Sequence, residues 1–246
     1  MRISRGPQSD IIGGVPEPLR FMNFSFARSA FASAVFIALI ACPAAVAQTP
    51  PLVIDIPDAP IAMRVLVQSP AETVTDLQVI CLFQSSPLNT LHGSLAEINE
   101  KLHGLLDRVR KPELFAGQLG ETLLIAPPKD SLPAKRLLLI GLGDSQTFSP
   151  QRMELVGEIV YHEAGRVGVS HPFFAPTILD GGVSKFNTGD IAEQVISGFL
   201  RASATAKSLQ DAHASSQLAI SALTFLAGAK NAENTRQGIE RALKQK

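Results

Sequence analysis

The fold class of this chain follows from the run Leu137-Leu138-Leu139-Ile140-Gly141-Leu142-Gly143. Its first four residues are apolar, without the alternation typical of a strand that has one face in water. Strands of this kind are usually covered on both faces, as in a sheet between layers of helices. The glycines predict a turn, and Ser149-Pro150 predicts the cap and first turn of a helix. The run therefore indicates a buried strand of an α/β protein.

Strand-like and helix-like segments alternate on both sides of this run. Ser94 and Glu97 predict a capping box at the start of a helix, and Asp190 and Glu193 predict another helix start. The alternation predicts an α/β sandwich with a mixed or mostly parallel sheet. Apolar β-type runs indicate strands over 63–67, 77–83, 120–126, 173–179 and 218–226, and three- and four-residue apolar spacing indicates helices over 94–110, 150–160, 190–200 and from 231 to the end.

The first 47 residues have the pattern of a secretory signal peptide. Arg28 precedes a charge-free run over 29–54, and the small residues Ala45 and Ala47 form a cleavage site of the A-x-A type. Translation could also start at Met22, which would give a shorter signal peptide that fits the pattern better. Residues 48–60, which contain four prolines, are expected to form an extended lead-in, so that one domain occupies 61–246.

Two other interpretations of this segment stay open. Leu39-Ile40-Ala41-Cys42 resembles a lipobox, in which Cys42 would be lipidated and hold the protein at a membrane surface. A transmembrane anchor is less consistent with the sequence, because the run is rich in Ala and Ser and is interrupted by Pro43. We therefore expect an exported protein, periplasmic or secreted, with a lipid-anchored form as the alternative.

The net charge of the chain limits the classes of partner that we expect, and its cysteine content bears on the chemistry that it can perform. Residues 1–47 hold four of the 22 basic and two of the 22 acidic residues, so the remainder is nearly neutral. A nearly neutral surface has no positive electrostatic potential that would attract nucleic acid, so no nucleic-acid partner is expected. A membrane is expected as a partner only if the protein is lipidated. Cys81 is the one cysteine beyond the signal, and its apolar neighbours predict a small core residue rather than a nucleophile.

No catalytic or metal-binding motif stands out, and no cofactor is expected. The histidines lack the spacing of metal ligands, and no G-x-S-x-G elbow is present. The best candidate for a ligand site is the turn Gly141-Leu142-Gly143-Asp144, which follows a buried strand where α/β sheets bind ligands. Gly181 and Gly182, after the next strand, are expected to help line the same cleft. The sequence nevertheless favours a purely structural turn over a ligand site, because position 146 is Gln where a third glycine would stand.

Several segments together resemble the N-terminal domain of the leucyl (cytosol) aminopeptidase family. The resemblance covers about residues 61–246. It is carried by Phe115-x-Gly117-x-x-Gly120-Glu121, by the stretch from Pro133 to Gly143, by Val195-Ile196-Ser197-Gly198-Phe199-Leu200, and by Thr235-Arg236-Gln237-Gly238-Ile239-Glu240.

The resemblance implies a macro-domain-like fold and a domain without catalytic residues. In this family the metal ions and acid–base groups lie in a C-terminal domain, and the present sequence ends before that domain would begin. Asn187-Thr188-Gly189-Asp190 is superficially similar to a family metal signature but is expected to cap a helix. Three functions remain: binding or assembly with a protein partner or a second copy, an accessory part of an aminopeptidase whose catalytic domain is on another chain, and macro-type binding of an ADP-ribose-like ligand.

Overall fold

The computed structural model describes residues 50–85, 90–111, 114–216 and 219–245. The chain divides into two compact units, and the second, Gln48–Lys246, contains all of these residues. The predicted signal segment, with Ala45, Ala47 and Cys42, lies outside the described residues. None of the described helices combines the length and the apolar character that crossing a membrane requires.

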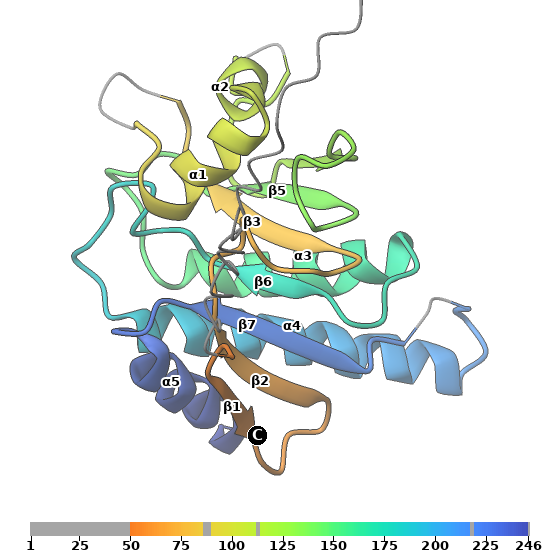
Figure 1. Cartoon of the computed structure of the whole chain (residues 1–246). Helices are drawn as coiled ribbons and strands as arrows, with labels where there is room; N and C mark the ends of the chain where they lie inside the picture. The colour runs from red at the N-terminus through yellow and green to blue at the C-terminus, as the bar shows by residue number, and fades with distance from the viewer. Residues whose placement is uncertain (1–49, 86–89, 112–113, 217–218, 246) are drawn as a thin grey trace, which may run out of the picture. The chain divides into compact units, whose positions relative to one another are not determined.

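The described part of the chain forms a seven-stranded sheet and five helices (Figure 1). The strands are β1 (Val53–Ile56), β2 (Ala62–Val67), β3 (Gln78–Leu82), β4 (Thr122–Ile125), β5 (Leu137–Gly141), β6 (Phe173–Ala175) and β7 (Ala222–Ala227). The helices are α1 (Gly93–Lys101), α2 (Leu105–Val109), α3 (Arg152–Arg166), α4 (Thr188–Asp211) and α5 (Ala232–Lys244).

The sheet is mostly parallel, as the sequence predicts. Its strand order is β1-β2-β7-β6-β3-β5-β4. The five inner strands run parallel to one another, while β1 pairs with β2 and β4 pairs with β5 in antiparallel fashion. The carboxyl ends of β2, β7, β6, β3 and β5 therefore lie along one edge of the sheet.

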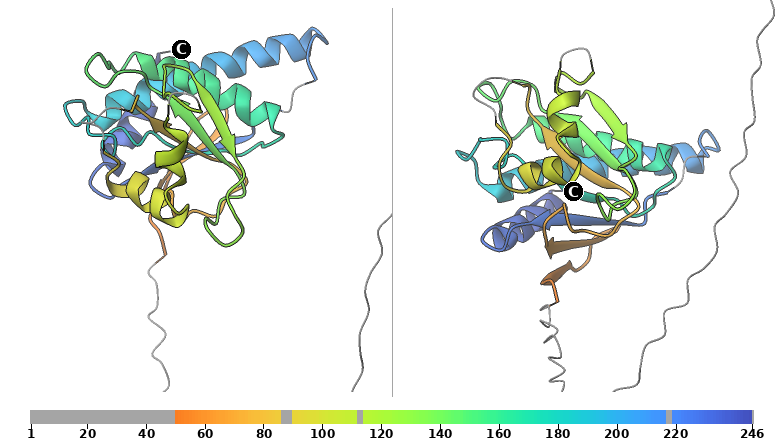
Figure 2. Two further views of the ribbon diagram at one scale, coloured as in Figure 1. Left: turned by 90° about the horizontal axis from the view of Figure 1, so that it is seen from above. Right: turned by 45° about the horizontal axis from the view of Figure 1, so that its top comes forward.

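Helices cover both faces of the sheet, which explains the continuous apolar runs in its strands. In β3, Val79 and Cys81 join the core formed with α3, α4 and α5, whereas Ile80 and Leu82 join the core formed with α1 and α2. The views in Figures 1 and 2 show α1 and α2 on one side of the strands and α3 and α4 on the other. The predicted three-layer α/β fold is confirmed.

Local boundaries differ from the sequence expectations in several places. The helix expected over 94–110 is broken, because His103 and Gly104 adopt positive φ angles between α1 and α2. The strand expected over 173–179 stops at Ala175, because Pro176 lacks a backbone donor and Thr177 has a φ of 50°. The lead-in expected over 48–60 contains an edge strand, β1.

Three predicted helix caps also prove wrong. Residue 92 is the N-cap of α1, and Ser94 and Glu97 bond outside the helix instead of forming a capping box. Helix α3 begins two residues after Pro150, following a turn in which Arg152 N donates to Ser149 O (3.1 Å). The cap of α4 is Asn187, whose side chain accepts from Gly189 N (2.7 Å), rather than Asp190.

Glycines let the three long helices approach each other closely. A Cβ on Gly198 of α4 would overlap the backbone of Glu154 in α3, and a Cβ on Gly157 of α3 would overlap the backbone of Val195 in α4. Arg201 of α4 pairs with Glu154 and Glu158 of α3 beside this crossing. The glycine of the Val195–Leu200 segment is therefore required by helix packing.

We predict that Gly198→Ala lowers the free energy of unfolding by about 1–3 kcal/mol, because overpacking outweighs the roughly 1 kcal/mol that alanine gains in helix propensity. Urea denaturation of the mature domain measures this change. Gly228→Ala is the control, because a Cβ at Gly228 meets nothing within 4 Å. Equal stability of the Gly198→Ala variant and the parent would show that the helices can separate at no cost.

Candidate functional site

A cavity of about 440 Å³ opens at the carboxyl ends of β2, β6 and β7. Its floor is formed by the last residues of these strands, including Val67, Ala175 and Ala227. Its interior is mainly apolar, with contributions from Ile178, Val183, Phe186, Ile191, Phe225 and Leu226. The edge of an α/β sheet where parallel strands end is the usual position of ligand sites in such folds.

One wall of the cavity joins the start of α1 to the loop between β6 and α4. The carboxylate of Asp180 accepts hydrogen bonds from Ser94 N (3.2 Å) and Ser94 Oγ. Next to them, Glu97 Oε2 accepts from Ser69 Oγ (2.6 Å). All four side chains line the cavity, so this wall carries two carboxylates that are held in place by hydroxyl groups.

The facing wall is built from the first turns of α4 and α5. Thr188 and Ile191 contribute from α4, and Asn231 and Thr235 from α5. The start of α4 packs closely against α5, since a Cβ on Gly238 of α5 would overlap the backbone of Gly189 in α4. The Oγ1 atom of Thr188 is buried and has no hydrogen-bond partner in the described structure.

Thr177 fixes the β6–α4 loop to the sheet beneath the cavity. Its hydroxyl accepts from Cys81 N (2.9 Å) and donates to Cys81 O (2.6 Å). Cys81 itself is only 1% exposed, and burial raises the pKa of its thiol. The expectation that Cys81 is a small core residue is confirmed. Only the thiolate is nucleophilic, so the raised pKa agrees with the expectation that Cys81 is not a nucleophile, which stays a prediction.

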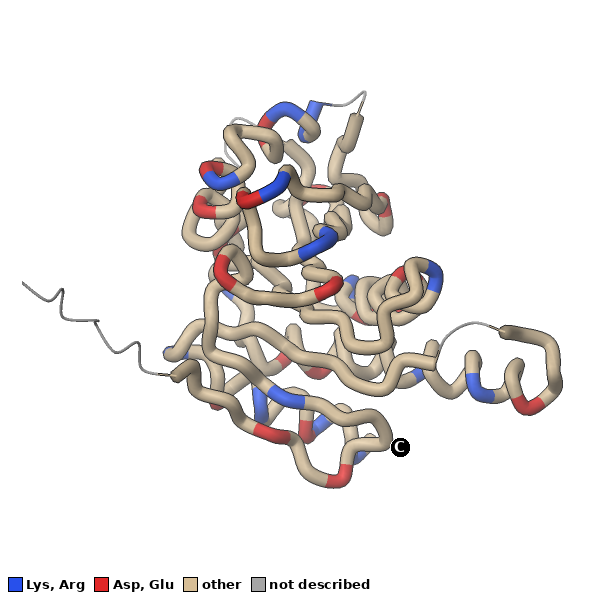
Figure 3. Tube along the Cα trace, turned by 45° about the vertical axis from the view of Figure 1, so that its right-hand side comes forward, with Lys and Arg blue, Asp and Glu red and all other residues tan. Residues whose placement is uncertain are grey.

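The described lining residues include two acids, Glu97 and Asp180, and no Lys, Arg or His. Two lysines stand near the cavity without lining it. Lys101 approaches Glu97 within 3.8 Å, and the Lys185 ammonium lies 5.0 Å from the ring centre of Phe186. Over the described chain as a whole, basic and acidic residues are interspersed (Figure 3).

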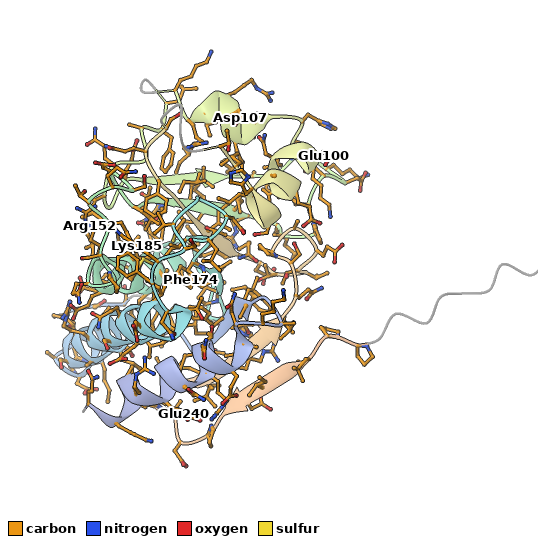
Figure 4. The ribbon with its side chains drawn as sticks, turned by 90° about the vertical axis from the view of Figure 1, so that its left-hand side faces the viewer. Glu100, Asp107, Arg152, Phe174, Lys185 and Glu240 are labelled. Atoms are coloured by element: carbon orange, nitrogen blue, oxygen red, sulfur yellow. The ribbon has the colours of Figure 1, made fainter. Side chains whose placement is uncertain are left out.

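The turn from Gly141 to Asp144, which the sequence offers as the best candidate for a ligand site, does not line this cavity. Segment 117–120 packs onto it: Gly120 N donates to Gly141 O (3.0 Å), and Gly143 N donates to Gly117 O (2.9 Å). Leu142 is fully buried, whereas Asp144 is exposed. Figure 4 shows Arg152, which bonds to this turn, on the opposite side of the molecule from Glu100 of α1. Ligand binding at Gly141, Leu142, Gly143 and Asp144 stays a prediction.

Gly181 and Gly182 lie beside the cavity but do not line it. They follow Asp180 in the loop, and Gly181 packs against the Phe83 ring, which a Cβ would approach to 2.7 Å. Gly182 has a φ of 86°, which suits the turn to Val183.

Asn187 caps α4, in agreement with the expectation that segment 187–190 is a cap. Within the described residues, no group of three or more His, Cys, Asp or Glu side chains could hold a metal ion.

Sequence reasoning missed the lining residues because they form no local motif. They come from positions between 67 and 235, and each is an ordinary polar or apolar residue in its own segment. The one available signal was the segment Pro176–Phe186, which directly follows a buried strand and contains Asp180 and two glycines.

We predict that Thr177→Val destabilises the domain by about 1–3 kcal/mol, because the buried amide and carbonyl of Cys81 each lose a hydrogen bond. Thermal and urea denaturation measure the effect. Thr205→Val serves as control, since Thr205 is exposed and bonds only within α4. An unchanged unfolding free energy for Thr177→Val would show that the hydroxyl does not hold the loop.

Comparison with known proteins identifies the sequence family. The profile of the cytosol aminopeptidase family, N-terminal domain, matches residues 79–210. A probable cytosol aminopeptidase of Roseiflexus castenholzii is 33% identical over 119 residues, which is 48% of this chain and 21% of that protein. One from Thermosynechococcus vestitus is 30% identical over 91 residues, or 37% of this chain and 18% of that protein. The matched segment thus spans about a fifth of these relatives.

Solved structures support the fold alone. A mutant of the Oceanobacillus iheyensis macrodomain aligns with a TM-score of 0.56 and 11% identity, covering 79% of this chain and all of the macrodomain. A mutant of tomato leucine aminopeptidase aligns with a TM-score of 0.55 and 20% identity, covering 80% of this chain and 38% of that protein. The expected macro-like fold is confirmed.

Proposed function

This chain belongs to the cytosol aminopeptidase family through its N-terminal domain. We propose that it is an exported, non-catalytic domain that binds a small ligand in the cavity at the ends of β2, β6 and β7. The observation that carries the proposal is the cavity itself. Its size of about 440 Å³ lies in the range of small-molecule sites.

The chemistry of the cavity supports binding. A mainly apolar interior with a few fixed polar groups provides both affinity and orientation for a small molecule. Here Ser94 at the start of α1 and Asp180 in the β6–α4 loop are held by their hydrogen bond, whereas Thr188 Oγ1 at the start of α4 is buried without a hydrogen-bond partner in the described structure. The proposal therefore assigns the domain a recognition role.

We expect ligand-observed NMR with a panel of neutral, cationic and anionic fragments, ADP-ribose among them, to find at least one that binds the mature domain. Gly228→Phe should weaken that binding at least tenfold. Gly228 is exposed, lines the cavity and has open space at its Cβ position, so the ring would cover the opening without overpacking the core.

Ala204→Phe is the matched control, because residue 204 is exposed on α4 and does not line the cavity. Its melting temperature and fragment binding should equal those of the parent. The proposal is contradicted if no fragment binds, or if both phenylalanine variants bind equally well.

The non-catalytic part of the proposal predicts no hydrolysis. Incubation of the purified mature domain with a leucyl chromogenic substrate and manganese should give the rate of buffer alone. Turnover above that rate would support a role in an aminopeptidase instead. Restoration of turnover by a co-purifying chain would identify the domain as an accessory subunit.

Export is supported by the sequence pattern of residues 1–47. Mass spectrometry of the protein recovered from cells should give a mature N-terminus at Gln48, after Ala45-x-Ala47. A diacylglyceryl-modified Cys42 would instead show the lipid-anchored form. Recovery of the intact chain with its first residues in the cytosol would overturn the proposed export.

A further inference from the structure

We propose that the cavity accepts a mainly apolar ligand whose polar group is a cationic donor, and that Asp180 makes it reject phosphate-bearing and other anionic molecules. This inference rests on the proposed function, since it names the class of ligand for the same site. It starts from the wall at which helix α1 begins.

Asp180 occupies the position at the start of α1 where an anion would otherwise bind. The free amides at a helix N-terminus attract negative charge, and α1 starts at the cavity wall. Here the Asp180 carboxylate accepts hydrogen bonds from Ser94 N (3.2 Å) and from the Ser94 hydroxyl. It also lies so close to Gly93 that a Cβ there would overlap it. The protein has filled this anion position with its own side chain.

The other two helix starts at the cavity also have their own acceptors or acids. Asn187 accepts from Gly189 N at the start of α4, where Asp190 stands in the first turn. Glu233 occupies the first turn of α5. Neither Asp190 nor Glu233 lines the cavity, but each offsets the positive end of its helix.

The charge balance at the wall is therefore negative. A helix N-terminus acts as roughly half a positive charge, whereas Asp180 carries a full negative charge. Glu97 adds a second carboxylate, which Lys101 approaches within 3.8 Å. A phosphate would enter an apolar cavity beside two carboxylates and pay for desolvation with no cation lining the described walls.

The remaining surface indicates what a ligand would gain by binding. Phe186, Ile191 and Phe225 offer apolar contacts to a hydrocarbon or aromatic group. The two carboxylates, already fixed by Ser69 and Ser94, keep free lone pairs that can accept hydrogen bonds from an ammonium group. An amine attached to an apolar body matches both features.

The test compares two probes that share a phenethyl group and carry opposite charges, phenethylamine and 3-phenylpropanoate, by calorimetry and protein-observed NMR on the mature domain. We expect phenethylamine to bind at least tenfold more tightly, with NMR shifts at cavity residues that Gly228→Phe abolishes. ADP-ribose should not bind. Tighter binding of the carboxylate or of ADP-ribose at the cavity, or no binding of phenethylamine, would overturn the inference.

Asp180→Asn isolates the role of the charge, because the amide oxygen still accepts from Ser94. We expect the preference for the amine over the carboxylate to fall at least tenfold, with the melting temperature nearly unchanged. Asp190→Asn is the matched control: it removes the same charge from the first turn of α4, outside the cavity, and should leave the preference intact. Equal effects of the two variants would contradict a specific role for Asp180.

These outcomes separate the two proposals. If an anionic fragment binds and Gly228→Phe blocks it, the cavity is a binding site and only the ligand class proposed here is wrong. If no fragment of any charge binds, the proposed function fails as well.

Discussion

The close approach of α4 to its two neighbours is the constraint on which the rest of this structure depends. Gly157 and Gly198 leave no room for a side chain between α3 and α4, and Gly189 and Gly238 leave none between α4 and α5. Backbone therefore meets backbone at both crossings. These contacts fix the first half of α4 against α3 and against α5, so that the start of α4 lies beside α5 on one face of the sheet.

The cavity follows from this arrangement. The strands β2, β7 and β6 are parallel neighbours, so their carboxyl ends lie side by side. The first turns of α4 and α5 lie next to these ends and line the cavity. The β6–α4 loop, tied to β3 by Thr177, crosses to α1 and places Asp180 against Ser94. Packing of the helices thus decides the shape of the site, while the β6–α4 loop and α1 contribute its two carboxylates, Asp180 and Glu97.

The same edge of the sheet shows why two similar glycine segments have different roles. After β5, the turn from Gly141 to Asp144 is closed by segment 117–120, which bonds to it through Gly117 and Gly120. After β6, the chain continues with Pro176 and with Thr177, whose φ is positive and whose hydroxyl bonds to Cys81 of β3, and the cavity opens at the end of the strand. A glycine turn that follows a buried strand can therefore lie where another segment covers the end of the strand, or where a cavity opens there.

The sequence by itself determined the three-layer fold, because continuous apolar strands require cover on both faces. It also determined the family, since the resemblance includes glycines at which a helix or turn touches backbone, namely Gly117, Gly141, Gly198 and Gly238. Only the tertiary structure decided where the cavity lies and which charges face it. Asp180 and Ser94 are 86 residues apart, and the lining extends from Val67 to Thr235. Such residues have no common pattern along the chain, since they meet only through the order of the strands and the crossing of the helices.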